Sequence, residues 1–122
     1  MALLDQPVST SPGPASPASL RPPRPADLVR VEHLPAQRRF VLHVGARRAG
    51  FTEYFEADGR RAFVHTEVGQ PFTGRGLASV LVRAAMTTTR ADGLQVVALC
   101  PYVRRWVEGH PGYEDLVVAP RP

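Results

Sequence analysis

Apolar and polar residues alternate along four stretches in the first part of the chain. A two-residue period is typical of strands that bury one face only. The predicted strands cover residues 28–33, 40–44, 51–57 and 61–68. A turn is expected over 45–48, and Asp58-Gly59 is a strong hairpin signal. The pattern therefore predicts an antiparallel meander.

The same period divides the side chains of these strands between two faces. In the second strand, Phe40, Leu42 and Val44 share one face, with Val41 and His43 on the other. The third strand should alternate through Phe51, Glu53, Phe55 and Ala57. In the fourth strand, Phe63, His65 and Glu67 share one face, and Val64, Thr66 and Val68 share the other.

The period changes to that of a helix after residue 76. The predicted helix runs from Leu77 to about Thr89 and ends at Asp92-Gly93. Its predicted apolar stripe consists of Leu77, Val80, Leu81, Ala84, Ala85 and Thr88. The apolar run 94–99 predicts a fifth strand, and Tyr102 to Gly109 predicts a short helix with Val103, Trp106 and Val107 inward.

Composition limits the class of protein. Residues 1–27 contain seven of the 13 prolines, so we expect a disordered tail followed by one compact domain over 28–122. The start of the chain lacks a basic segment followed by an apolar one, and no apolar run approaches a membrane span. We therefore expect a cytoplasmic protein without a membrane partner. A single cysteine leaves no disulfide and too few thiols for structural zinc, and we expect no metal.

Charge argues against nucleic acid as the main partner. The net charge is +4, all 15 basic residues are arginine, and they are scattered in the sequence rather than interleaved with aromatic residues. An arginine-dependent nucleic-acid accessory domain is therefore the weakest of the three functional hypotheses; the other two follow from the motifs described below.

The segment 68–78 carries the strongest chemical signal. A predicted strand leads through Gly74-Arg75-Gly76 into the predicted helix, and such a junction can hold a phosphate group on the free amides of the helix. A Walker loop is excluded because the chain has no lysine, and Ser79 stands where a dinucleotide fingerprint needs glycine or alanine. An isolated Gly-x-Gly is also common in ordinary turns.

Several motifs in order favour one phosphate ligand. They are His65-Thr66-Glu67-Val68, Gly74-Arg75-Gly76-Leu77-Ala78, Leu99-Cys100-Pro101-Tyr102-Val103 and His110-Pro111-Gly112-Tyr113. Together they resemble the GNAT superfamily of acyl-CoA-dependent N-acetyltransferases, and most of all its small single-domain members, over roughly residues 29–118. The resemblance implies an α/β (α+β) fold. Its mostly antiparallel, twisted sheet would carry a crossover helix between the fourth and fifth strands, which splay apart to admit acyl-CoA.

The resemblance also implies cofactor-binding residues, with acetyl-CoA as cosubstrate. The backbone amides from Thr73 through Gly74, Arg75, Gly76 and Leu77 to Ala78 would hold the CoA pyrophosphate, and Arg75 would add charge. Val68 would border the cofactor, and Arg104 and Arg105 would meet the ribose phosphate or remain solvated. Pro71 departs from the family pattern, in which arginine or glutamine often precedes the first glycine by three residues.

Acetyl transfer to an amine needs a base, donors to the oxyanion and an acid for the leaving thiolate. Glu67 and His65 are the candidate bases, each with a structural alternative: a solvated carboxylate and a packed histidine. Tyr102 is the candidate acid.

Cys100 has three open roles. It precedes Pro101, at the expected start of a helix, where a thiol pKa should fall. It can attack the thioester, with His65 as an activating partner, or line the site without covalent chemistry, or simply be a small buried residue.

The predicted function is acetyl transfer from acetyl-CoA to a primary amine; the alternative is a non-catalytic acyl-CoA-binding or protein-interaction module. The short connection 34–37 leaves no room for the two helices that shape the acceptor pocket in larger relatives, so we expect a shallow, open acceptor cleft. The acceptor and the oligomeric state are left open.

Overall fold

The computed structural model describes residues 28–120. It contains one five-stranded sheet with the strands in sequential order, β1-β2-β3-β4-β5. The strands are β1 (Val29–Leu34), β2 (Arg39–Val44), β3 (Arg47–Ala57), β4 (Arg60–Val68) and β5 (Gln95–Ala98). The helices are α2 (Leu77–Ala91) and α3 (Pro101–Glu108), with short 3-10 turns η4 (Pro35–Gln37), η5 (Gln70–Phe72) and η6 (Glu114–Leu116).

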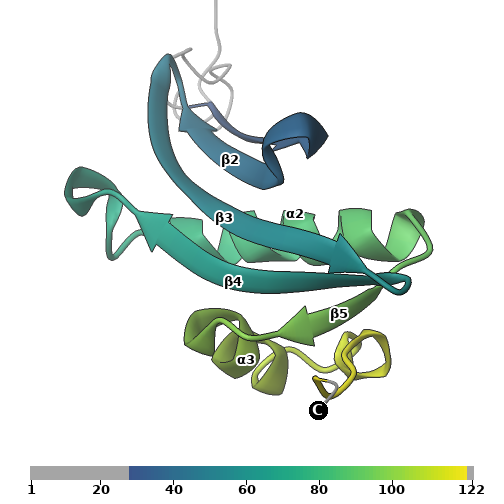
Figure 1. Ribbon diagram of the computed structural model, residues 1–122. Coiled ribbons are helices and arrows are strands. Elements are labelled where there is room, and N and C mark those ends of the chain that lie inside the picture. Colours follow the sequence, from purple (N-terminus) through teal and green to yellow (C-terminus); the bar gives the residue numbers. More distant parts are fainter. Residues whose placement is uncertain (1–27, 121–122) are drawn as a thin grey trace, which may run out of the picture.

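The first four strands pair antiparallel, and β5 pairs parallel to β4 after the α2 crossover. This topology confirms the predicted α/β class and the predicted place of the crossover helix (Figure 1). The predicted turn 45–48 is too long, because β3 already begins at Arg47 and hydrogen-bonds to the end of β2.

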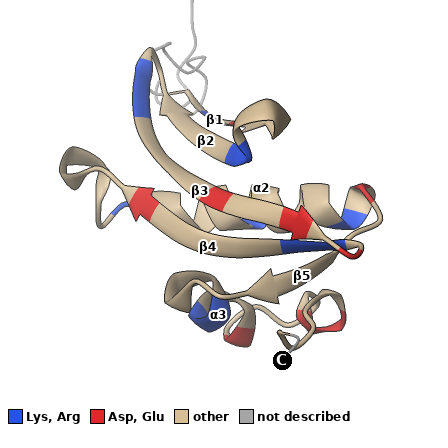
Figure 2. Cartoon of the chain, viewed as in Figure 1, with Lys and Arg blue, Asp and Glu red and all other residues tan. Residues whose placement is uncertain are grey.

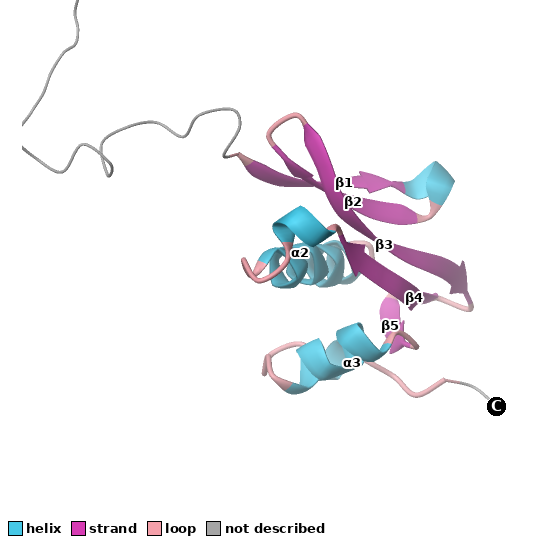
Figure 3. Ribbon diagram, turned by 90° about the vertical axis from the view of Figure 1, so that its left-hand side faces the viewer, coloured by secondary structure: helices cyan, strands magenta, loops and turns pink. Residues whose placement is uncertain are grey.

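Both helices lie on one side of the sheet, and no helix covers its other side within residues 28–120 (Figure 3). The helix side carries the main hydrophobic core, in which Phe40, Tyr54 and Phe63 from the sheet pack against Leu81 and Met86 of α2. We call the opposite side, which carries Phe51, Phe55, His65 and Glu67, the open face.

The predicted apolar stripe of α2 is rotated by part of a turn. Val82, Met86 and Thr89 are buried, whereas Val80 is exposed and Thr88 is half-buried. Burial of Val82 and Met86 removes more apolar area from water than burial of Ala84 and Thr88 would, so the sheet selects this side of the helix. The helix ends as predicted, with Gly93 in a left-handed conformation (φ 75°).

The predicted faces of β4 are wrong because the strand contains a β-bulge. Glu53 pairs with His65 but Tyr54 pairs with Phe63, so Val64 is an extra residue on β4. One inserted residue reverses the two-residue alternation. Phe63 is therefore fully buried in the core, while His65 and Glu67 are exposed on the opposite face rather than sharing the face of Phe63.

Arg61 connects the start of β4 to the end of α2. Its side chain is only 4% exposed and binds Glu56 at 2.7 Å and Asp92 at 3.1 Å. It also donates to Thr89 Oγ1 at 3.1 Å and lies 4.7 Å from the Tyr54 ring centroid. A buried guanidinium with several partners fixes the angle of the crossover helix on the sheet.

The predicted tail, residues 1–27, lies outside the described residues and stays a prediction. Within residues 28–120 no helix has the length and apolar character needed to cross a membrane. Over the same residues no cluster of three or more potential metal ligands is present.

Candidate functional site

The strands β4 and β5 separate halfway along β4. Their pairing runs from Arg60 with Gln95 to Phe63 with Ala98. The Phe63 carbonyl then accepts the N–H groups of Leu99 (3.0 Å) and Cys100 (2.8 Å). Beyond this point β4 continues to Val68, while the chain after β5 turns into α3 (Figure 1). We call the region between the end of β4 and α3, where β4 has no paired strand on this side within the described residues, the wedge.

The end of β4 presents backbone hydrogen-bonding groups to the wedge. Gly69 N–H bonds to Ala49 on the β3 side at 2.7 Å. Because these groups alternate along a strand, those of Val68 and Thr66 point toward the wedge. No strand pairs with this edge in the part of the chain that the structure describes, so it can bind an extended ligand.

The glycine loop lies between the end of β4 and α2. Gly74 (φ 76°) and Gly76 (φ 72°) adopt left-handed conformations, which explains the need for glycine at both positions. Gly76 is the N-cap of α2, and the Val80 N–H is bound to its carbonyl. The N–H groups of Leu77 and Ala78 therefore lack intrahelical acceptors, and no acidic residue stands in this first turn.

Thr73, which was predicted to bind the pyrophosphate through its backbone amide, already donates to another residue. The Thr73 N–H donates to the Gln70 carbonyl at 3.3 Å, and the Thr73 hydroxyl donates to the same oxygen at 3.0 Å. The amides available to an anion therefore begin at Gly74.

Two guanidinium groups flank Phe72 beside the loop. Arg75 lies 5.8 Å from the ring centroid and Arg47, at the start of β3, lies 4.8 Å from it. Sequence reasoning identified Arg75 but missed Arg47. The sequence contains no local signal for Arg47, because this residue approaches the glycine loop only through the pairing of β3 with β4.

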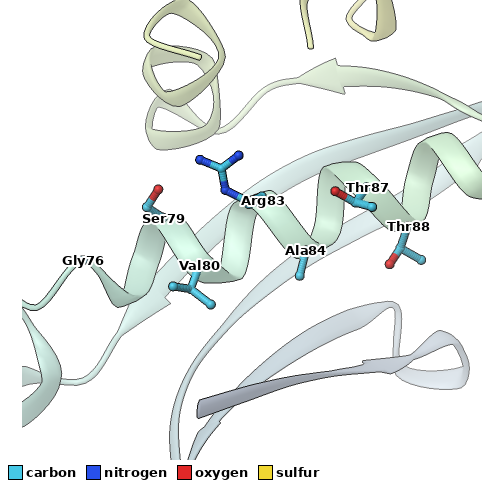
Figure 4. A pocket seen from close by; sticks show the side chains of 7 residues that line it. All are labelled: Gly76, Ser79, Val80, Arg83, Ala84, Thr87 and Thr88. Atoms are coloured by element: carbon cyan, nitrogen blue, oxygen red, sulfur yellow. The ribbon is translucent and has the colours of Figure 1, made fainter. Parts of the chain in front are cut away.

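A groove continues from the loop along the outer side of α2. Its volume is about 610 Å³. Its lining residues are Gly76, Ser79, Val80, Arg83, Ala84, Thr87 and Thr88. Ser79 and Arg83 point toward α3, and Val80 and Ala84 point away from it (Figure 4). Ser79 accepts a 2.8 Å bond from Trp106 Nε1, which ties α2 to α3. Arg83 was not predicted as a site residue.

Cys100 lies on the core side of the wedge. It is 4% exposed and is the N-cap residue of α3, but its sulfur makes no capping bond. The thiol donates to Thr66 Oγ1 at 3.5 Å, and Thr66 Oγ1 lies 2.9 Å from Thr52 Oγ1. Thr52 in turn donates to the His65 carbonyl at 3.2 Å, so Thr66 must be the donor to Thr52.

His65 and Glu67 form a pair on the open face. Nε2 of His65 is 3.2 Å from Oε1 of Glu67, with 55% and 62% of the two side chains exposed. The His65 ring also packs beside Phe51 at 5.8 Å between centroids. The proposed His65–Cys100 pair is wrong: Cys100 contacts Thr66, and adjacent residues of a strand point to opposite faces.

The three candidate residues on α3 differ in whether their side chains are available to a ligand. Tyr102 is half-buried against the core, and burial raises the pKa of its hydroxyl, so it is protonated at neutral pH. Arg104 donates to the carbonyls of Ala98 (3.4 Å) and Leu99 (3.3 Å) at the end of β5. Arg105 is exposed.

Comparison with known proteins identifies the family to which this arrangement belongs. The family model described as GCN5-related N-acetyl-transferase matches residues 39–116, which span β2 to η6 and include the wedge and the glycine loop. The chain belongs to the GCN5-related N-acetyltransferase family. Members of this family generally use acetyl-CoA and transfer its acetyl group.

Individual proteins are similar to this GCN5-related chain in sequence or in fold. Protein NATD1 of Xenopus tropicalis is 30% identical over 89 residues, covering 71% of this chain and 82% of the relative. Protein NATD1 of Homo sapiens is 29% identical over 85 residues, covering 68% and 75%. A Staphylococcus aureus protein described as GCN5-like, solved by NMR, superposes with a TM-score of 0.58 at 18% identity, covering 75% of this chain and 90% of its own.

Proposed function

We propose that this protein transfers the acetyl group of acetyl-CoA to a primary amine. One observation carries the proposal: the glycine loop and the free amides of α2 lie at the end of the same strand, β4, whose unpaired edge borders the wedge. A ligand with an anionic end and an extended, amide-containing arm fits this arrangement, and acetyl-CoA is such a ligand.

The pyrophosphate lies on the amides from Gly74 to Ala78, with Arg75 and Arg47 supplying positive charge. The adenosine end follows the α2 groove, where Arg83 can meet a phosphate. The pantetheine arm extends along Val68 and Thr66, which places the thioester near the bulge at Val64.

The amine attacks the thioester carbonyl carbon from the open face. A C–N bond forms, the C–S bond breaks, and the ammonium proton passes to the Glu67–His65 pair, directly or through water. Backbone N–H groups on the wedge edge of β4 stabilise the oxyanion. Tyr102, whose pKa is raised by burial, protonates the departing CoA thiolate.

The contacts of Cys100 support direct transfer rather than an acetyl-cysteine intermediate. A nucleophilic thiol must first lose its proton to a base. Its proton points to Thr66, and the chain of hydroxyls from there ends on the His65 backbone carbonyl, which is not a base at neutral pH. In this proposal Cys100 forms one wall of the wedge, and no bond to its sulfur is made.

A non-catalytic acyl-CoA-binding module is the second candidate. It is favoured by the exposure of His65 and Glu67, because a solvated pair lacks the burial that usually tunes a catalytic base. This candidate predicts acetyl-CoA binding without transfer to any amine.

Calorimetric titration with acetyl-CoA tests the binding of acetyl-CoA, which both candidate functions require. The variant Gly76→Asp places a carboxylate at the phosphate site, and Gly76→Asn is its neutral control. Asn and Asp both tolerate the left-handed backbone of this position, and a side chain there meets nothing within 4 Å. Loss of binding in the Asp variant alone supports the site. Failure of the unmodified chain to bind acetyl-CoA would refute both candidates.

A further inference from the structure

The open face carries an apolar surface beside the wedge. Three large apolar side chains on adjacent parts of the sheet are unusually exposed: Phe55 on β3 (46%), Val64 in the bulge (40%) and Leu99 after β5 (38%). A cavity of about 310 Å³ lies beside two of them, Phe55 and Leu99. Its lining residues are Phe55, Ala57, Asp58, Arg60, Ala62, Val97, Leu99 and Pro120. Its size is at the lower end of small-molecule sites.

This cavity adjoins the point where the wedge opens. The N–H groups of Leu99 and Cys100 make the last bonds to the Phe63 carbonyl before β4 and β5 separate, and Leu99 lines the cavity. Ala62 and Val97, next to core residues on their strands, place the cavity on the face opposite α2. A molecule seated in the cavity therefore approaches the thioester from the side opposite the core and the CoA groove.

Charge orients such a molecule. β4 is basic at its start and acidic near its end (Figure 2). Arg60 and Asp58 both line the hairpin end of the cavity, and the buried Nε of Arg60 lacks a hydrogen-bond partner among the described residues. Glu67 lies beyond the bulge, next to His65. The opposite charges of Arg60 and Asp58 offset each other at the hairpin end, whereas Glu67 attracts a cationic group, so the amine points toward the wedge.

We propose that the acceptor is a small primary amine with an apolar, preferably aromatic, body. The body fills the cavity against Phe55 and Leu99, and the amine extends over Val64 toward the Glu67–His65 pair. His65 is three residues from Ala62 on β4, a span of about 10 Å. An aromatic ring with a two- or three-carbon amine chain is matched to this reach. A polyamine lacks the apolar body that would fill the cavity against Phe55 and Leu99. This proposal rests on the proposed function.

Steady-state release of CoA tests the acceptor class, with 2-phenylethylamine compared with ethanolamine and spermidine. The expected result is a kcat/KM at least tenfold higher for 2-phenylethylamine. The variants Phe55→Ser and Val64→Ser should raise its KM by about tenfold, because burial of such side chains contributes one to two powers of ten. Val29→Ser is the matched control, since Val29 is also a strand valine with 40% exposure but lies on the distant β1.

A second measurement separates the proposal from the proposed function. ¹⁵N-labelled protein saturated with CoA is titrated with 2-phenylethylamine and observed by NMR. Saturable shifts at Phe55, Val64 and Leu99 support the amine site even if transfer is absent. Transfer to other amines without these shifts, or equal kcat/KM for all three amines, would overturn the acceptor class while leaving acetyl transfer standing. Dimerisation abolished by Phe55→Ser, with no amine shifts, would assign the surface to a second copy of the chain.

Discussion

The thiol of Cys100 lies 3.5 Å from Oγ1 of Thr66, and this contact sets the chemistry of the wedge. Thr66 and its neighbour His65 point to opposite faces of β4, so the thiol and the imidazole are separated by the sheet itself. The candidate base and the candidate nucleophile therefore belong to different sides of the site.

Replacement of Cys100 distinguishes direct transfer from a covalent intermediate. Cys100→Ser keeps a donor to Thr66, and we expect kcat to remain within about threefold of the unmodified protein, since no bond to sulfur is formed. Mass spectrometry after incubation with acetyl-CoA should show no acetylated protein. An acetyl group on Cys100, together with a loss of kcat of three powers of ten in the Ser variant, would establish the covalent route instead.

Replacement of Glu67 tests the base. Glu67→Gln preserves shape and removes the proton acceptor, so kcat should fall by about 10²- to 10⁴-fold while the Kd for acetyl-CoA is unchanged. Glu108→Gln, an exposed glutamate on α3, is the control and should have no effect on kcat. A similar kcat for both variants would remove Glu67 from the mechanism.

The arginines at Phe72 should affect cofactor binding only. Arg47→Ala and Arg75→Ala each remove a charge near the pyrophosphate, and each should weaken acetyl-CoA binding by about 1 kcal/mol, roughly fivefold in Kd. Arg30→Ala, which removes an exposed arginine on β1, should leave the Kd unchanged. The effect should diminish with added salt. Equal affinity in all three variants would place the phosphates elsewhere.

Arg61 should be important for stability. Arg61→Met retains much of the apolar packing but removes the bonds to Glu56, Asp92 and Thr89. Both carboxylates are partly exposed and can be hydrated, so we expect a loss of about 1 to 3 kcal/mol in the free energy of unfolding. Denaturant unfolding measures this loss. A variant as stable as the unmodified protein would show that the network is replaceable by apolar packing.

Stability should fall on the acidic side of neutrality because of His33. Burial, and then the nearby Arg61 charge, lower the pKa of His33 below its ordinary value of 6.5. The unfolded chain therefore binds this proton more readily than the folded chain. The contribution of neutral His33 to the free energy of unfolding is fully present above pH 6.5 and decreases as the pH falls below that value.

The ring of His33 stacks on Phe40 at 4.1 Å between centroids, and its Nε2 is 2.6 Å from the Tyr54 hydroxyl. His33→Phe keeps the stacking and should reduce the dependence of Tm on pH between 5 and 7. NMR titration of the ring checks the cause directly. A His33 midpoint at or above pH 6.5 would contradict this explanation.

Local patterns in the sequence were sufficient for the elements and for the phosphate loop. Two-residue alternation located the four antiparallel strands, and Asp92-Gly93 marked the end of α2, because these features depend on neighbours along the chain. The order of motifs from His65 to Tyr113 was sufficient for the family, which the match over residues 39–116 confirms.

The tertiary structure decided which of these residues meet. The bulge at Val64 reversed the faces of β4 and separated His65 from Cys100, since one inserted residue depends on the pairing with β3 and leaves no local signal. The side of α2 that is buried, the approach of Arg47 to the glycine loop and the apolar cavity at Phe55 and Leu99 depend in the same way on contacts between distant segments. A periodic pattern specifies which positions can share a face, but only packing of the whole sheet against the helices determines what that face contacts.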